Sequence, residues 1–143
     1  MRDRLAMMRA GSRIVRDHPW VGVGPNMIAR IYPQYRDAGA VEPAPPHLHN
    51  VPLQIAAERG LPALALWLWF VGATVFSTVR LFRSAPPQGT LRFLSAAALA
   101  SMVAMLGAGM FEHNFGDSEF LMIFLVLITL PFAVAKEPIR SAA

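Results

Sequence analysis

Four histidines are the side chains in this sequence best suited to acid–base chemistry near neutral pH. They are His18, His47, His49 and His113. An unperturbed imidazole titrates near pH 6.5, so it exchanges protons at physiological pH and in its neutral form also binds metal ions. His18 precedes Pro19, where a structural role at a turn is expected. For His113 and Asp117, in a short polar loop, we expect loop and helix-capping roles.

His49 lies just ahead of a predicted helix, and this position favours a neutral imidazole. Asn50 is a residue type that caps helix N-termini, and Pro52 suits the first turn. The partial positive charge at a helix N-terminus opposes protonation of a neighbouring imidazole. We therefore expect His49 to be able to accept a proton, with a capping or packing role as the alternative.

The H-x-H spacing of His47 and His49 raises metal binding as a second possibility. Glu112, His113 or Asp117 would complete such a site if the two segments met. Two histidines at this spacing are a weak signal by themselves. The sequence reading therefore assigns no metal ligand.

An arginine on the apolar side of a predicted helix is the second candidate for chemistry. Residues 3–17 show helical periodicity, and most of their arginines form one stripe that is expected to face solvent or lipid headgroups. With Arg2 at its start, this stripe comprises Arg2, Arg9, Arg13 and Arg16. Arg4 lies on the other side, where a guanidinium needs an anionic partner. That partner is either Asp117 or Glu112, or a bound phosphate group.

The segment between this helix and His47 predicts a turn, a short helix and a loop. In the turn at residues 20–25, Gly22 and Gly24 permit close backbone approach, but the spacing is not that of a nucleotide-binding loop. Asn26 is expected to cap a short helix that ends at Tyr35. Residues 37–46 are rich in glycine and proline and predict an irregular loop.

Three apolar stretches predict membrane-spanning helices. Residues 61–82, 91–111 and 119–135 each approach the roughly 20 residues that a bilayer requires. The 143 residues are 55% hydrophobic and only 15% charged, which is too apolar for an ordinary soluble domain, and the absence of cysteine excludes a disulfide scaffold. We predict an all-α, polytopic membrane protein. A helical region at residues 1–60 precedes the spans, its last helix ends at Gly60, and a tail follows the spans at residues 136–143.

The distribution of basic residues predicts the orientation of these spans. The loop at residues 83–92 and the tail are basic, whereas the loop at residues 112–118 is acidic. The positive-inside rule places the first two in the cytoplasm, and therefore residues 1–60 and 112–118 outside. Nucleic-acid binding is not expected, because the basic residues surround apolar spans and form no dense patch.

Three segments, in order along the chain, resemble the O-antigen ligase family, which includes Wzy-type polysaccharide polymerases. They are Arg4 with residues 18–25 (HPWVGVGP), residues 49–62 (HNVPLQIAAERGLP) and residues 114–119 (NFGDSE). The resemblance is to the end of the family's large periplasmic loop and its last helices. It implies a C-terminal part of a multi-pass protein of the bacterial inner membrane, with its N-terminal half in the periplasm.

The same resemblance implies an activity in lipopolysaccharide biosynthesis. Such a glycosyltransferase passes a glycan from undecaprenyl pyrophosphate to a hydroxyl, in ligases one on the lipid A core, without a metal or cofactor. His49 matches the family's essential histidine, proposed as the general base, and Arg4 matches the arginine proposed to hold the pyrophosphate. Arg9, His47, Asn50 and Asp117 are predicted to bind substrate.

Other functions remain open on the sequence alone. A polysaccharide polymerase would use a lipid-linked glycan as acceptor, and a protein O-oligosaccharyltransferase of the same family would use a protein hydroxyl. A third possibility is a small, non-catalytic three-span protein whose basic helix binds anionic lipid or a partner subunit. Substituting His49 separates this last possibility from the enzymes.

Overall fold

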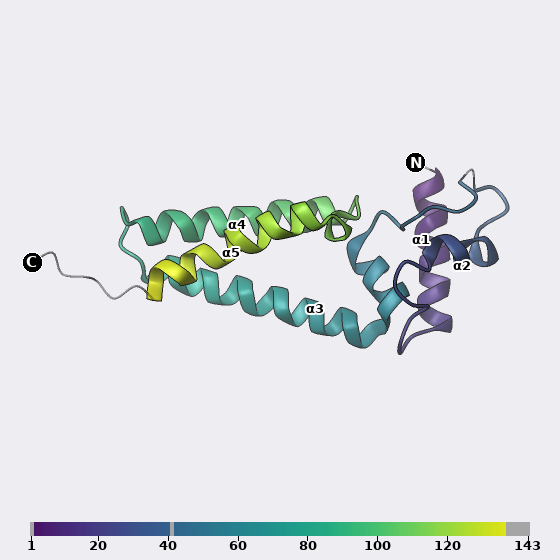
Figure 1. The fold of residues 1–143 in the computed structure, drawn as a ribbon, viewed down its shortest axis with the longest axis horizontal. Coiled ribbons are helices and arrows are strands. Elements are labelled where there is room, and N and C mark those ends of the chain that lie inside the picture. The colour runs from purple at the N-terminus through teal and green to yellow at the C-terminus, as the bar shows by residue number, and fades with distance from the viewer. Residues whose placement is uncertain (1, 41, 137–143) are drawn as a thin grey trace, which may run out of the picture.

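The computed structural model describes residues 2–40 and 42–136, and every regular element within these ranges is a helix (Figure 1). The elements are α1 (Arg2–Asp17), α2 (Ile28–Tyr35), α3 (Val51–Ser84), α4 (Thr90–Gly109), the 3-10 turn η1 (Asn114–Gly116) and α5 (Ser118–Lys136). The all-α prediction is confirmed. The predicted tail lies outside the described residues, apart from Lys136.

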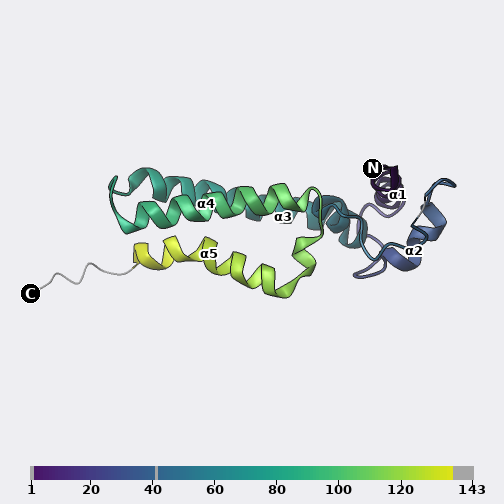
Figure 2. The same ribbon diagram turned by 90° about the horizontal axis from the view of Figure 1, so that it is seen from above.

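Three of the helices are long and apolar enough to cross a membrane, namely α3, α4 and α5. They lie side by side along the long axis of the molecule, with α4 packed against both neighbours (Figures 1 and 2). Their shared core comprises Ala98, Met102, Met105, Phe124 and Ile128. Many large apolar side chains face outward instead, among them Trp69, Phe76, Phe93 and Met122. Such an apolar exterior suits lipid and is unfavourable in water, so the prediction of three spans is confirmed.

The helix α1 runs across the long axis at one end of this bundle (Figures 1 and 2). It packs on α2 and on the first turns of α3. Their common core comprises Met7, Ala10, Ile14, Ile28, Tyr32, Leu48 and Ala57. The burial of one face of α1 follows from its helical periodicity.

One residue of the arginine stripe on α1, Arg13, is less solvated than the sequence predicts. Arg13 is half-buried, donates to the Tyr35 carbonyl at 2.9 Å and pairs with Asp37 at 2.6 Å. The exposed Arg9 also approaches Asp37, at 3.7 Å. Periodicity along α1 could not reveal this, because Asp37 belongs to the loop that follows α2. Arg9 and Arg13 therefore hold the loop against α1.

A kink at Gly60 divides α3 into a short first part and a long apolar part. Gly60 has φ 83°, and a Cβ there would lie 2.2 Å from the Trp20 carbonyl oxygen. The backbone of Gly22 approaches this turn equally closely, and Gly24 donates its N–H to the Glu58 carbonyl at 2.9 Å. The turn at residues 20–25 thus satisfies carbonyls that the kink leaves unpaired. The predicted helix end at Gly60 and the close approach at Gly22 are confirmed.

The predicted capping role of Asn26 is wrong. Helix α2 begins after Met27, and no side chain caps it. Asn26 adopts a left-handed conformation with φ 58°, which asparagine tolerates better than most residues. It therefore belongs to the preceding turn, one residue too early to cap the helix.

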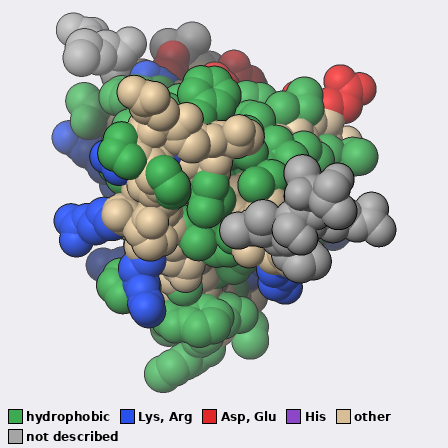
Figure 3. Space-filling view, turned by 90° about the vertical axis from the view of Figure 1, so that its left-hand side faces the viewer, with side chains coloured by type: hydrophobic (Ala, Val, Ile, Leu, Met, Phe, Trp, Pro, Cys, Tyr) green, Lys and Arg blue, Asp and Glu red, His purple; other side chains and the backbone are tan. Residues whose placement is uncertain are grey.

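The two ends of the bundle differ in what they carry. The α3–α4 loop and the end of α5 lie at one end, whereas the loop between α4 and α5 lies at the other, beside α1 and the start of α3 (Figure 1). Viewed from the first end, the surface is largely apolar with basic side chains around it (Figure 3). The polar N-terminal region and the acidic loop thus share one end.

Candidate active site at the start of α3

Three histidines and a glutamate gather where the chain enters α3. The Nδ1 atom of His49 lies 2.8 Å from Oε1 of Glu112, on the loop after α4. The His47 ring packs edge-on against His49, with ring centroids 4.2 Å apart, and its centroid is 5.4 Å from that of His113. The structure therefore joins two segments that the sequence could only suggest as neighbours.

Asn50 holds the two segments together. Its side-chain oxygen accepts a hydrogen bond from the backbone N–H of Leu53 at 2.9 Å, which confirms the predicted N-cap. Its amide group also donates to the carbonyl of Met110 at 3.3 Å, two residues before Glu112 in the chain. The buried Asn50 side chain thus anchors the start of α3 to the end of α4. Its predicted role in substrate binding stays a prediction.

The backbone at His49 is in an unusual conformation. His49 has φ 50°, in the left-handed region that non-glycine residues rarely occupy. Such a conformation costs free energy and persists only where surrounding contacts impose it. The contacts here are the Asn50 cap on one side and the hydrogen bond to Glu112 on the other.

Local interactions favour an ionised Glu112. The backbone N–H of His113 donates to its carboxylate at 3.3 Å, and this bond and the one to His49 hold the pKa of Glu112 below its usual range. Because an ionised carboxylate only accepts hydrogen bonds, Nδ1 of His49 is the donor in the pair. In neutral His49 the remaining ring nitrogen, Nε2, is then an acceptor and able to take a proton.

The pKa values of the two neighbouring histidines, His47 and His113, lie below the usual range. Burial, together with the neighbouring His49, lowers the pKa of His47. Burial and the neighbouring His47 lower the pKa of His113. His113 lies in the loop, as expected, and makes no side-chain cap to η1. Its ring instead packs over Gly116, where a Cβ would lie 2.6 Å from it.

Arg4 reaches the same loop from α1. Its guanidinium donates to the carbonyl of Phe111 and lies over the Phe111 ring, 5.2 Å from the centroid. The expected ion pair with Asp117 or Glu112 is absent from the ion pairs of the described residues, and the backbone carbonyl takes its place. A guanidinium carries five donors, so further N–H groups of the exposed Arg4 remain for a phosphate.

The remaining predicted site residues lie around this centre or away from it. Asp117 accepts from the backbone N–H groups of Glu119 and Phe120, at 3.0 and 3.3 Å, and so caps α5 as expected. Arg9 faces Asp37 on the α2 side of α1. For both residues, substrate binding stays a prediction.

Glu112 is a candidate site residue that the sequence pattern undervalues. The sequence suggests Glu112 as a partner for Arg4 or as a metal ligand, but not as the hydrogen-bond partner of His49, which lies 63 residues earlier. The acidic character of the short loop was the only signal, because the α4 helix that brings this loop to His49 leaves no local pattern at Glu112.

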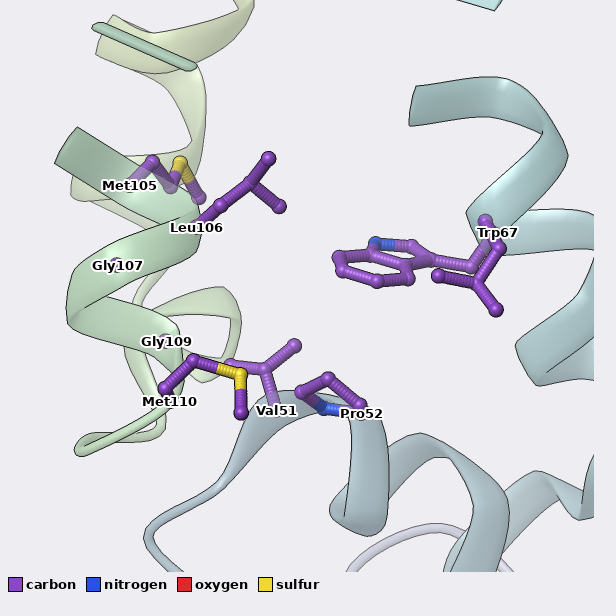
Figure 4. Close-up of a pocket in the computed structure, with 9 residues that line it drawn as sticks. Val51, Pro52, Trp67, Met105, Leu106, Gly107, Gly109 and Met110 are labelled. Carbon is purple, nitrogen blue, oxygen red and sulfur yellow. The ribbon is translucent and has the colours of Figure 1, made fainter. Parts of the chain in front are cut away.

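An apolar hollow of about 340 Å³ adjoins the site between α3 and α4. Figure 4 shows it enclosed by Val51 and Pro52 at the start of α3, Trp67 further along α3, and the end of α4. Val51 directly follows the Asn50 cap, so a polar cluster and an apolar hollow meet at one helix start.

Comparison with known proteins identifies the first part of the chain. Residues 1–68 match the family model described as O-antigen ligase, and no curated protein matches the chain. The matched range contains α1, α2 and the start of α3, and therefore Arg4, His47, His49 and Asn50. Glu112 lies beyond it. This match over residues 1–68 agrees with the resemblance to the O-antigen ligase family that the sequence shows.

Proposed function

We propose that this chain carries the catalytic histidine of a membrane glycosyltransferase that ligates O-antigen. The donor is a glycan on undecaprenyl pyrophosphate, and the acceptor is a hydroxyl of the lipid A core. The observation that carries the proposal is the 2.8 Å contact that Glu112 makes with His49, a histidine inside the range that matches the O-antigen ligase family model. A histidine oriented by a carboxylate is the usual arrangement of a general base.

The reaction needs one proton transfer and one displacement. His49 takes the proton of the acceptor hydroxyl at Nε2, while Glu112 accepts the hydrogen bond from Nδ1–H and stabilises the imidazolium that forms. The acceptor oxygen attacks the anomeric carbon of the donor sugar. The bond from that carbon to the pyrophosphate oxygen breaks, and undecaprenyl pyrophosphate leaves with the electron pair. A single displacement of this kind inverts the configuration at the anomeric carbon.

Arg4 is the group proposed to stabilise the leaving pyrophosphate. Its guanidinium contacts Phe111, and the next residue, Glu112, contacts His49. The candidate cation and the candidate base therefore both contact the loop after α4. Negative charge grows on the pyrophosphate as the bond breaks, and a guanidinium binds phosphate oxygens in a bidentate manner. The apolar hollow beside Val51 gives the site a lipid-compatible wall.

The proposed location of the site is the periplasmic face of the inner membrane. The basic loop at residues 83–92 predicts a cytoplasmic position for that end of the bundle. The His49 site lies at the opposite end, with α1 and the acidic loop (Figure 1). The site would then bind lipid-linked glycans on the periplasmic side of the membrane.

Complementation of a strain that lacks its O-antigen ligase tests this function. The gene, with any in-frame coding sequence upstream, is expressed beside His49→Ala and the control His18→Ala, and lipopolysaccharide is separated by gel electrophoresis. We expect the parent and His18→Ala to restore the O-antigen ladder and His49→Ala to abolish it at equal membrane levels. A parent that inserts but restores no ladder contradicts the ligase assignment and favours a polymerase, a protein-glycosylating enzyme or a non-catalytic protein.

A further inference from the structure

We propose that His47, His49 and Glu112 form a binding site for a divalent transition-metal ion such as Zn²⁺, and that the bound ion inhibits the enzyme. The binding itself is independent of the proposed function. The inhibition rests on it, because it requires His49 to be the base.

The geometry of the three side chains is close to that of a metal site. One ligand atom from each residue lies within 4.8 Å of the others. Bonds of about 2.0–2.2 Å to a tetrahedral ion place ligand atoms roughly 3.4 Å apart. The His49–Glu112 contact of 2.8 Å therefore has to open slightly, and the wider separations have to close by about an ångström. Glu112 is exposed, so rotation of its side chain toward the two half-buried histidines accommodates most of this change.

The donor atoms suit a transition metal better than Mg²⁺ or Ca²⁺. Two imidazoles and one carboxylate are ligands that Zn²⁺, Co²⁺, Ni²⁺ and Cu²⁺ favour, whereas the alkaline-earth ions prefer oxygen alone. The fourth position is free for water or for His113, whose ring lies next to His47. Three histidines and one glutamate in contact form a far stronger signal than the H-x-H spacing alone.

Unsatisfied nitrogen atoms provide a second, independent argument. The Nδ1 atoms of His47 and of His113 are buried and have no hydrogen-bond partner among the described residues. A buried polar atom without a partner costs free energy. A metal ion, alone or with a bound water, gives such atoms a partner.

A bound ion would remove the base from the reaction. An ion held by His49 and Glu112 replaces the hydrogen bond that orients the imidazole. Its positive charge also disfavours a second positive charge on the same ring, so His49 no longer accepts the hydroxyl proton. We therefore expect Zn²⁺ to inhibit the transferase and a chelator to restore its activity.

Metal titration of the purified full chain in detergent tests the site. The protein carries no polyhistidine tag and is treated with chelator beforehand. Zn²⁺ binding is measured by calorimetry, and Co²⁺ binding by visible absorption. We expect one ion per chain and no binding of Mg²⁺. His47→Gln, His49→Gln and Glu112→Gln should each weaken Zn²⁺ binding at least about tenfold, since even outer-shell changes cost roughly 10- to 100-fold.

Two further variants separate ligation from folding. His18→Gln is the matched control, because His18 contacts Tyr35 and lies outside the cluster. His47→Cys keeps a zinc ligand, so it should retain binding and shift the Co²⁺ absorption. No saturable Zn²⁺ binding, unchanged binding in His47→Gln, or an equal loss in His18→Gln would overturn the site. Zn²⁺ that binds without slowing an active transferase would overturn the inhibition alone, and an inactive transferase that still binds Zn²⁺ would count only against the proposed function.

Discussion

His49 and Glu112 are 63 residues apart in the chain, and their side chains meet at 2.8 Å. His49 lies just before α3, and Glu112 follows α4. Their contact lies at the end of the bundle where α1 also delivers Arg4 to Phe111. The packing of α3 on α4 therefore brings the candidate base and its carboxylate partner together, and α1 adds the candidate phosphate-binding cation.

Replacing Glu112 by glutamine is expected to slow glycan transfer with little effect on substrate KM. The amide keeps the size of the side chain but loses the charge that stabilises the imidazolium. We expect a smaller loss in kcat than the roughly 10²- to 10⁴-fold that removal of a general base causes in His49→Gln. Transfer in membranes with a lipid-linked donor measures both. Glu119→Gln, on the same side of the bundle, is the control, and an equal loss there contradicts the role of Glu112.

Replacing Arg4 by lysine is expected to weaken donor binding although the charge is kept. Lysine cannot bind a phosphate group in a bidentate manner or reproduce the planar contact with Phe111. The donor KM should rise several-fold, and Arg4→Ala should lower kcat as well. Arg16→Lys serves as the control, because Arg16 is exposed and its ion pair within the described part of the chain is with its neighbour Asp17. Equal kinetics for Arg4→Lys and wild type would refute the assignment.

Gly60→Ala is expected to destabilise the protein by about 2 kcal/mol or more. The added Cβ meets the Trp20 carbonyl at 2.2 Å, and φ 83° is unfavourable for alanine. Thermal unfolding in detergent, followed by tryptophan fluorescence, reports the loss as a lower Tm. Gly72→Ala is the matched control in the same helix, since a Cβ there has nothing within 4 Å. A Tm equal to that of Gly72→Ala would show that the kink tolerates a side chain.

Asn50→Ala is expected to cost about 1–2 kcal/mol, because the helix cap and the bond to Met110 are both lost. Asn50→Asp keeps the capping oxygen but not the amide donor, so its loss should be smaller. The difference between the two Tm values separates the contribution of the helix cap from that of the hydrogen bond linking α3 to α4. Equal losses would mean that the link to Met110 dominates.

The local features of this protein follow from its amino-acid sequence. The periodicity of residues 3–17, the cap at Asn50, the helix end at Gly60 and the three apolar spans all appear as predicted. Each depends on residues close together in the chain, where residue type and spacing decide the backbone. The failure at Asn26 is of the same local kind, because the turn before α2 takes one more residue than its cap signal implied.

Which side chains meet depends on the tertiary structure. The pairing of His49 with Glu112, the contact of Arg4 with a carbonyl instead of an acid, and the ion pair of Arg13 with Asp37 all join separate elements. Residue types alone allow several such partners. The packing of α3 on α4 and the kink at Gly60 select one of them, because together they place the start of α3 beside the end of α4.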